Sequence, residues 1–369
     1  MSEQNNGKTT DPAEKNGLLP HQKKSKRKAW RVLRVVLFVM LGVAIIMGAV
    51  YFVLYQTGKG KMENKTGMLT TLANDTDETV QEDDGRTVMY KGETYLLNEN
   101  IVTILCIGSD NETMIEDPDS FGKNGQADAI FLQTIDVKTG KAVVIGISRD
   151  SMADVDVYSL NGSFVRTDNK QICLAFAYGD GKKTSCDNVV KSVSRLFYGM
   201  PIEHYLSMDL QPIGILNDAI GGVTVTALED MKLSVGLVKK GETITLKGED
   251  ARRYVQSRNT KLLDSNIPRM KRQQQYLTAF AKKTLNMTKR DITTPVKLFN
   301  KTSQYLTTNL DTSKITYLTT SVLKNNYNGD IDFRMVQGKV VQGAKYAEFI
   351  VDDIALYEMI LDVFYNKVT

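Results

Sequence analysis

Short continuous apolar runs mark the chain from residue 100 onward. Three of them, at residues 101–107, 129–135 and 142–147, are rich in β-branched side chains, and runs of this length are typical of buried strands. The polar stretch 136–141 separates the second run from the third and has the composition of a tight turn. We therefore expect buried strands here, the last two joined as a β-hairpin.

Helical and extended patterns alternate in the residues that follow. The predicted helices and strands, in chain order, are a helix at 172–177, a helix at 189–197, a strand at 205–210, a helix at 212–220 and a strand at 223–226. A Gly-Gly pair at 221–222 ends the last of these helices. This alternation predicts an α/β fold, a layered α-β-α domain with helices on both faces of a central mixed sheet.

The strand ends are the first place to look for chemistry, because ligands of such sheets bind beyond the carboxyl ends of strands. Asp110 and Arg149 each follow a predicted strand, and Asp128 precedes one. Asp110 and Asp128 could share a divalent cation, since magnesium takes one or two carboxylates together with phosphate oxygens. Alternatively, each carboxylate caps a turn or pairs with an arginine, and Arg149 and Asp150 form a simple ion pair.

A second group of candidate residues lies around the start of a predicted helix that follows Pro268. Arg269 and Gln273 are i,i+4 neighbours on its first turns, and Arg272 lies one step around. Arg258 stands at the far edge of the loop that leads from an earlier helix, predicted at 248–255. Arginines that converge on a helix N-terminus form a site for a dense anion such as pyrophosphate. The alternative is a solvated face whose arginines pair with Asp264.

The N-terminal segment predicts a membrane anchor. Residues 35–54 carry no charge, and twenty such residues are enough to cross a bilayer as a helix. A cleaved signal peptide is the alternative, but its apolar region would be shorter. Seven Lys and Arg residues between 23 and 34 precede the apolar run. By the positive-inside rule they put the amino terminus in the cytoplasm and the large domain outside a cell membrane that the chain spans once.

The charge of the chain is concentrated in this tail. Residues 1–34 have nine Lys and Arg against three Asp and Glu, so a formal net charge of +4 leaves the remainder slightly acidic. The basic balance therefore does not indicate nucleic-acid binding by the folded part. We divide the chain into a basic cytoplasmic tail (1–34), a transmembrane helix (35–55), an extracytoplasmic spacer (56–95) and the folded domain (96–369).

Cysteine and histidine add two expectations. Cys106 lies in an apolar run and is expected to be a buried free thiol. Cys173 and Cys186 flank a Gly-rich turn outside the membrane, where disulfides persist, and we expect them to be bonded. The chain has two histidines, His21 in the tail and His204 at a strand start, so a Ser-His-Asp hydrolase is not expected.

Several short motifs in a fixed order make the chain resemble a known family. They are Ile-Gly-Ser-Asp at 107–110, Ala-Asp-Ala-Ile at 127–130, Ile-Ser-Arg-Asp at 147–150, Ala-Phe-Ala-Tyr-Gly at 175–179, Gly-Gly-Val at 221–223, Leu-Lys-Gly-Glu-Asp-Ala at 246–251 and Arg-Met-Lys-Arg-Gln-Gln at 269–274. Each motif is weak alone, but the ordered set resembles the extracytoplasmic domain of the LytR-CpsA-Psr family of Gram-positive bacteria.

The resemblance implies a function and a set of site residues. Members of the family are regarded as membrane-anchored phosphotransferases that move a glycopolymer, such as teichoic acid or capsule, from a polyprenyl-pyrophosphate carrier to peptidoglycan. The reaction is aided by Mg²⁺ or Mn²⁺, and pyrophosphate cleavage is a side activity. The implied residues are Asp110 and Asp128 for the metal, Asp110, Arg149, Arg258 and Arg269 for catalysis, and Lys170, Arg272 and Gln273 for substrate binding.

Two residues depart from the family pattern. Gln126 stands where many members have arginine, and Gln256 stands where a paired Arg-x-Arg usually begins. A protein that binds the lipid-linked glycan without turning it over is therefore a second hypothesis. A third is a regulator of envelope genes, the older label of the family. A cytoplasmic part of about 34 residues without a helix-turn-helix pattern argues against direct DNA control.

Overall fold

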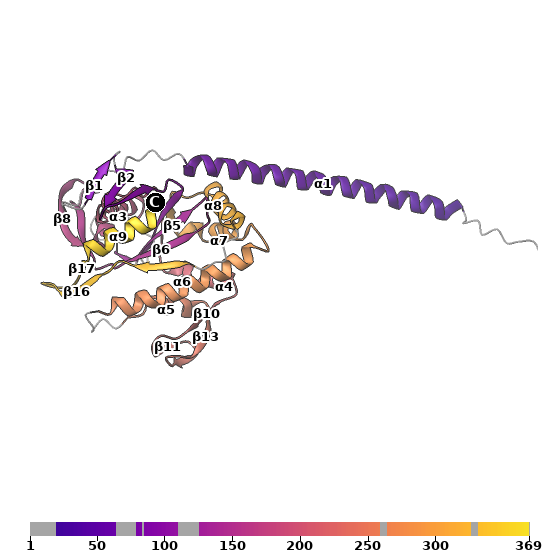
Figure 1. The fold of residues 1–369 in the computed structure, drawn as a ribbon. Helices are drawn as coiled ribbons and strands as arrows, with labels where there is room; N and C mark the ends of the chain where they lie inside the picture. The colour runs from indigo at the N-terminus through magenta and orange to yellow at the C-terminus, as the bar shows by residue number, and fades with distance from the viewer. Residues whose placement is uncertain are drawn as a thin grey trace, which may run out of the picture. The chain divides into compact units, whose positions relative to one another are not determined.

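The computed structural model describes residues 20–63, 79–82, 85–109, 125–258, 264–325 and 331–368. The chain forms two compact units, Met1–Val53 and Leu54–Thr369. Helix α1 (Pro20–Glu63) runs through the end of the first unit and into the second (Figure 1). Its stretch Gly42–Met62 is long and apolar enough to cross a membrane, by length and composition. The helix thus continues beyond both ends of the predicted 35–55 span.

A six-stranded mixed sheet forms the centre of the second unit, in the order β14-β9-β4-β5-β6-β15. The strands are β4 (Ile101–Ser109), β5 (Ala127–Asp136), β6 (Ala142–Ile147), β9 (His204–Met208), β14 (Leu306–Thr308) and β15 (Asp332–Met335). β5 pairs antiparallel with both β4 and β6, whereas β9 and β15 run parallel to their partners β4 and β6. The predicted hairpin and the predicted mixed α/β fold are confirmed.

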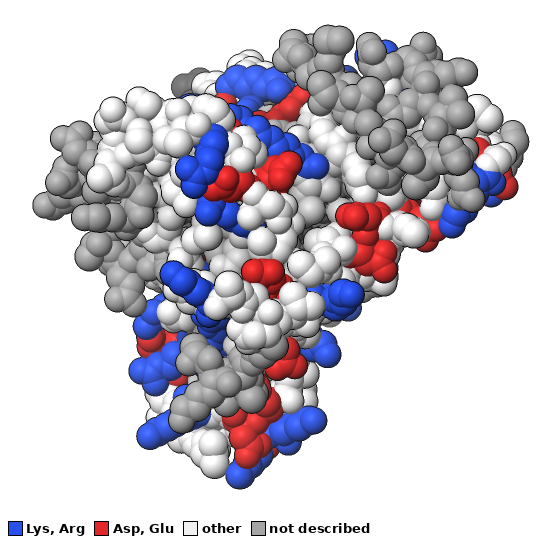
Figure 2. Space-filling model, turned by 90° about the vertical axis from the view of Figure 1, so that its left-hand side faces the viewer, with Lys and Arg blue, Asp and Glu red and all other residues white. Residues whose placement is uncertain are grey.

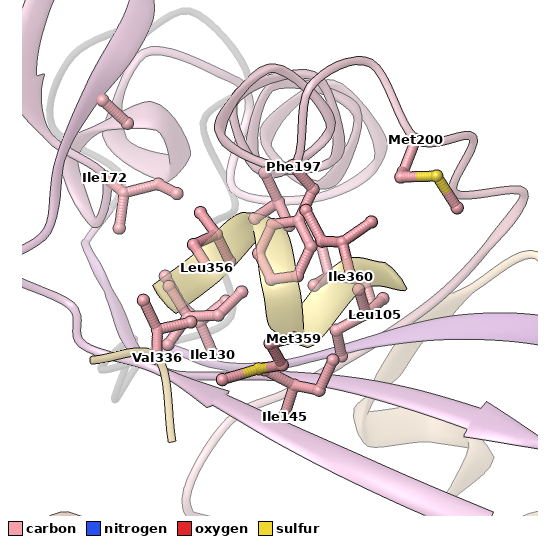
Figure 3. Close-up of a cluster of buried hydrophobic side chains, with 14 of the residues drawn as sticks. Leu105, Ile130, Ile145, Ile172, Phe197, Met200, Val336, Leu356, Met359 and Ile360 are labelled. Atoms are coloured by element: carbon pink, nitrogen blue, oxygen red, sulfur yellow. The ribbon is translucent and has the colours of Figure 1, made fainter. Parts of the chain in front are cut away.

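Both faces of this sheet are covered, which explains the continuous apolar runs. On one face, Leu105 of β4 packs with Ile360 of α9 (Asp353–Phe364) in the main core, together with Phe197 beyond α3 (Lys183–Leu196) (Figure 3). The short helix α2 (Leu174–Ala177) adds to the same core. On the other face, Ile104 packs with Leu318 of α8 (Thr312–Lys324). Because successive side chains of a strand point to opposite faces, a strand covered on both sides must be apolar throughout.

A smaller core forms beside the sheet. It is built by α4 (Gln211–Ala219), β10 (Val223–Thr226), β11 (Met231–Leu233), β12 (Gly236–Val238), β13 (Thr243–Leu246), α5 (Glu249–Gln256), α6 (Asn266–Thr288) and α7 (Thr294–Thr302). The strand predicted at 223–226 is present as β10, but it pairs with β13 in a separate ribbon. α6 begins at Asn266, so Pro268 lies inside its first turn, where a missing N–H is tolerated.

Other segments complete the unit. A hairpin, β7 (Met152–Tyr158) with β8 (Phe164–Gln171), follows the central strand β6. β16 (Gly338–Gln342) pairs with β17 (Ala347–Val351). Part of the predicted 56–95 spacer is folded, because β1 (Thr79–Glu82), β2 (Thr87–Tyr90) and β3 (Glu93–Leu97) form a sheet with the last strand, β18 (Tyr365–Val368). The Tyr365 hydroxyl donates to the Gly85 carbonyl, 280 positions earlier. No local pattern in residues 56–95 reveals so distant a partner.

The last turns of α1 pack against α8 within the second unit. The rings of Tyr55 and Tyr317 lie 5.5 Å apart, and Lys61 Nζ lies 2.5 Å from Asp311 Oδ2. Gly58 is buried between the two helices, where an added Cβ would overlap the Ser313 carbonyl oxygen. The absence of a side chain at position 58 therefore permits this close approach.

Replacing Gly58 with leucine is expected to lower the free energy of unfolding by about 1–3 kcal/mol, because the overlap is with backbone that cannot move aside easily. Thermal unfolding of the full chain in detergent measures this. Gly60→Leu is the matched control, since nothing lies within 4 Å of a Cβ at that position of the same helix. Equal stability of the two variants would contradict the packing of α1 against α8.

Candidate active site

The antiparallel pairing of β5 with β6 sets the position of the site. Ile130 of β5 lies opposite Ile147 of β6, so the residues that begin β5 lie beside those that follow β6. Gln126 and Asp128 come from the first segment, and residues 148–150 come from the second. β4 ends at the same edge of the sheet. Side chains from separate parts of the sequence therefore meet at one edge.

Arg149 is the buried centre of this group. Its Nη1 forms an ion pair with Asp128 Oδ1, and its Nη2 donates to Gln126 Oε1. Nη2 also lies 3.3 Å from Cys173 Sγ, and Nε lies 3.6 Å from Asp150 Oδ1. The guanidinium is thus held in place by groups from three segments, which limits its rotamers.

Arg269 reaches the same carboxylate from the first turn of α6. Its side chain is 3% exposed, its Nη1 lies 3.7 Å from Asp128 Oδ2, and its Nη2 donates to the Asp128 carbonyl at 3.0 Å. Nη2 also donates to Asn266 Oδ1 at 2.8 Å, and Asn266 Nδ2 donates to Ser148 Oγ at 3.0 Å. Asn266 therefore ties the N-terminus of α6 to the end of β6.

The charges of the cluster influence one another. Burial, together with the nearby Arg258 and Arg149 cations, lowers the pKa of Arg269 to about 10, so the group is still protonated at neutral pH. Burial raises the pKa of Asp150, against the opposing effect of Arg149, Arg258 and Arg269. Arg258 is exposed just beyond the end of α5 and lies near enough for its charge to act on both Asp150 and Arg269.

The hydrogen bonds of the cluster leave two N–H donors unsatisfied. Within the part of the chain that the structure describes, Arg149 Nε and Arg269 Nε are buried without a hydrogen-bond acceptor. A buried unsatisfied donor is costly, and more so on a charged group. An anion with several oxygens, such as a phosphate, would satisfy such donors through charge-assisted bonds. The geometry therefore favours binding of a phosphate-like anion.

A family model covers nearly the whole of the second unit. The model of the LytR_cpsA_psr family matches residues 61–360. The chain belongs to the LytR-CpsA-Psr family. A curated relative, the polyisoprenyl-teichoic acid–peptidoglycan teichoic acid transferase TagU of Bacillus licheniformis, is 24% identical over 166 residues. That alignment covers 45% of this chain and 49% of the relative, so it spans about half the length of TagU.

Solved structures share the fold of this LytR-CpsA-Psr chain. TagV of B. subtilis superposes with a TM-score of 0.55 at 22% identity, over 72% of this chain and 96% of TagV. TagT bound to LI-WTA superposes with a TM-score of 0.51 at 20% identity, over 70% of this chain and 88% of TagT. At these identities the likeness concerns the fold.

Some of the predicted site residues of this chain lie together, and the others lie elsewhere or outside the described residues. Arg149, Arg258, Arg269 and Asp128 form the cluster, while Asp110 lies outside the described residues. Lys170 is on β8, a third exposed, and its Nζ lies 3.4 Å from Asp168 Oδ2. Sequence reasoning did not select Asn266 or Ser148. The signal for Asn266 was its i,i+3 spacing from Arg269 on one helix.

Arg272 and Gln273 bond to the C-terminal end of α5, and Arg272 Nη1 also pairs with Glu229 ahead of β11. Their role in substrate binding stays a prediction. Arg272 Nε donates to the Tyr254 carbonyl at 2.8 Å, and its Nη2 donates to the Ser257 carbonyl. Gln273 Nε2 donates to the Val255 carbonyl at 3.1 Å. The last carbonyls of a helix lack partners within that helix, and these two side chains supply them. Both residues thus join α6 to α5.

The described residues alone do not make a metal site. Among them, no group of three His, Cys, Asp or Glu side chains is placed to hold a metal ion. Asp128 is already paired with Arg149 and Arg269. As a hard oxygen ligand it suits Mg²⁺, but it needs further oxygens from a second carboxylate or from substrate phosphates.

The predicted disulfide is wrong. All three cysteines are free thiols, and Cys106 is partly buried rather than fully buried. Cys173 faces Arg149, whereas Cys186 on α3 bonds with Ser207 of β9, so the two sulfurs have different neighbours. Spacing across a turn does not determine where side chains point.

Thiol counting tests this arrangement. The unreduced chain is expected to give three reactive thiols after denaturation. In the native state Cys173 and Cys186 should react slowly, because both are buried and burial raises the pKa of Cys186 to about 12. A count of one thiol in unreduced, denatured protein would restore the disulfide.

Proposed function

We propose that this chain is a membrane-anchored phosphotransferase that moves a glycopolymer from a polyprenyl-pyrophosphate carrier to peptidoglycan. The observation that carries the proposal is the buried pair Arg149 and Arg269, each with an Nε that lacks an acceptor among the described residues. Arg258 adds a third, exposed cation whose charge acts on Arg269. Phosphoryl transfer depends on positioning and charge stabilisation, which such a cluster supplies.

The relatives support the same chemistry. TagU is by name a transferase of teichoic acid from a polyisoprenyl form to peptidoglycan, and TagT has been solved bound to LI-WTA. Membership of the family and the arginine cluster together favour a cell-wall glycopolymer as the transferred group. Among the described residues on the face shown in Figure 2, basic and acidic side chains are interspersed.

The proposed anchor is the apolar part of α1, with the amino terminus in the cytoplasm and the large unit outside. Asp128 and Asp110 are the proposed ligands of Mg²⁺ or Mn²⁺. A bound divalent ion would neutralise charge on the phosphate oxygens. Arg149, Arg258 and Arg269 would hold the pyrophosphate through their N–H groups, with Lys170 a further candidate contact.

The test is an assay of the full chain in detergent with a polyprenyl-pyrophosphate glycan, peptidoglycan fragments and Mg²⁺. We expect a glycan joined to peptidoglycan through a phosphodiester, release of polyprenyl phosphate, and loss of both in excess chelator. Pyrophosphate cleavage without acceptor would be a side reaction. If the chain binds the lipid but yields no product with Mg²⁺ or Mn²⁺, it is a non-catalytic binding protein. If it neither binds nor reacts, the proposal fails.

A further inference from the structure

Asp150 is a second carboxylate at the cluster, and its environment differs from that of Asp128. Asp128 accepts ion pairs from both Arg149 and Arg269. The contacts of Asp150 are longer, with Arg149 Nε at 3.6 Å and Gln171 Nε2 at 3.4 Å from its Oδ1, and Asn266 adds a side-chain hydrogen bond. Its side chain is 16% exposed. Asp150 therefore lies within the positive cluster and is partly exposed, and the Arg149 guanidinium lies farther from it than from Asp128.

The backbone of Asp150 is held from two sides. Its N–H donates to Ser148 Oγ at 3.3 Å, and its carbonyl accepts from the Phe349 N–H of β17 at 2.8 Å. Ser148 Oγ in turn accepts from Asn266 of α6. The backbone that carries the Asp150 carboxylate is consequently fixed beside Arg149 and Arg269, and a catalytic group needs such positioning.

We propose that Asp150 is the general base that accepts the proton of the acceptor hydroxyl during transfer. This inference rests on the proposed function and extends it to the second substrate, a carbohydrate hydroxyl. The hydroxyl oxygen forms a bond to the phosphorus that carries the glycan, and the bond from that phosphorus to the bridging oxygen breaks. Polyprenyl phosphate leaves with the electron pair, and the hydroxyl proton passes to the Asp150 carboxylate and then to water.

Asp150 suits this role better than Asp128 for an electrostatic reason. Two guanidiniums already engage the Asp128 carboxylate as ion-pair partners. Around Asp150, the charged groups are Arg149 after β6, Arg258 after α5 and Arg269 on α6, and the Cys173 thiol lies close by. Burial outweighs the arginines and raises the pKa of Asp150. A base whose pKa lies nearer to the working pH transfers protons more effectively.

The rate of transfer is expected to depend on pH. Asp150 must be ionised to act as a base, so transfer should weaken as pH falls through its raised pKa. In Asp150→Asn we expect single-turnover transfer to fall by about 10²–10⁴-fold, with the acidic limb of the pH profile abolished. Binding of the lipid donor should be retained, because the arginines remain. Asp150→Glu should restore part of the rate and the limb.

The experiment measures donor binding and single-turnover transfer for the full chain between about pH 4 and 8, a range that spans the ordinary pKa of an aspartate. Asp154→Asn is the control, because Asp154 is exposed on β7, outside the cluster. An Asp150→Asn variant that keeps the acidic limb overturns the role as base, and so does one that loses binding together with rate. Absence of transfer by the unmodified chain overturns the proposed function as well.

Discussion

Replacing Arg269 with alanine is expected to reduce glycopolymer transfer by about 10²–10³-fold, the usual cost of losing one well-placed charged donor in a desolvated site. Arg269 is buried, contacts Asp128 and lies close to Arg149 and Arg258. Its loss would remove positive charge where the leaving phosphate develops negative charge. Arg269→Lys should restore little, since an ammonium lacks the planar fork of donors.

The control is Arg253→Ala on the neighbouring helix. Arg253 is half exposed and pairs with Glu249 at 3.5 Å, away from the cluster. Because a buried arginine contributes to folding, thermal unfolding is measured for each variant. Arg258→Ala provides a second test, because Arg258 is exposed and its replacement should disturb folding less than that of a buried arginine. If Arg258→Ala and Arg253→Ala both transfer at the rate of the unmodified chain, the arginine cluster has no role in catalysis.

Replacing Arg272 with alanine is expected to destabilise the fold by about 2–6 kcal/mol, since the carbonyls of Tyr254 and Ser257 each lose a donor at about 1–3 kcal/mol. Arg272 is 2% exposed, and burial lowers its pKa to about 10. Denaturant unfolding of the full chain measures the loss.

Lys271→Ala is the matched control, because Lys271 is the exposed neighbour on the same turn of α6. Folded Arg272→Ala protein should still bind the lipid donor with an affinity close to that of the unmodified chain. Loss of donor binding with little change in stability would return Arg272 to the substrate site, where the sequence had placed it.

The central strands were predictable because burial on both faces leaves a simple local pattern. The apolar runs at 101–107, 129–135 and 142–147 correspond to β4, β5 and β6 within two residues at each end. β10 was also found, but its partner β13 was not, since pairing depends on contacts that no single segment encodes. The hairpin of β7 and β8 was missed because its strands are partly exposed and polar.

The candidate site was predictable only where strand ends specified it. Asp128 and Arg149 could be expected to meet because the hairpin of β5 and β6 brings their segments together. Arg269 and Arg272, three residues apart on α6, could not be told apart, although one faces Asp128 and the other faces the carbonyls of α5. Their difference depends on the tertiary packing of α5 against α6.

The pairing of β18 with β3 links the fold to the order of synthesis. Tyr365 pairs with Leu97 and also bonds to Gly85, 280 positions earlier. A ribosome adds about 5–20 residues each second, so β3 is made tens of seconds before its partner strand exists. During that time the edge of β3 that later pairs with β18 has no partner strand. A nascent chain of this protein is therefore incomplete as a folding unit until residues 365–368 emerge.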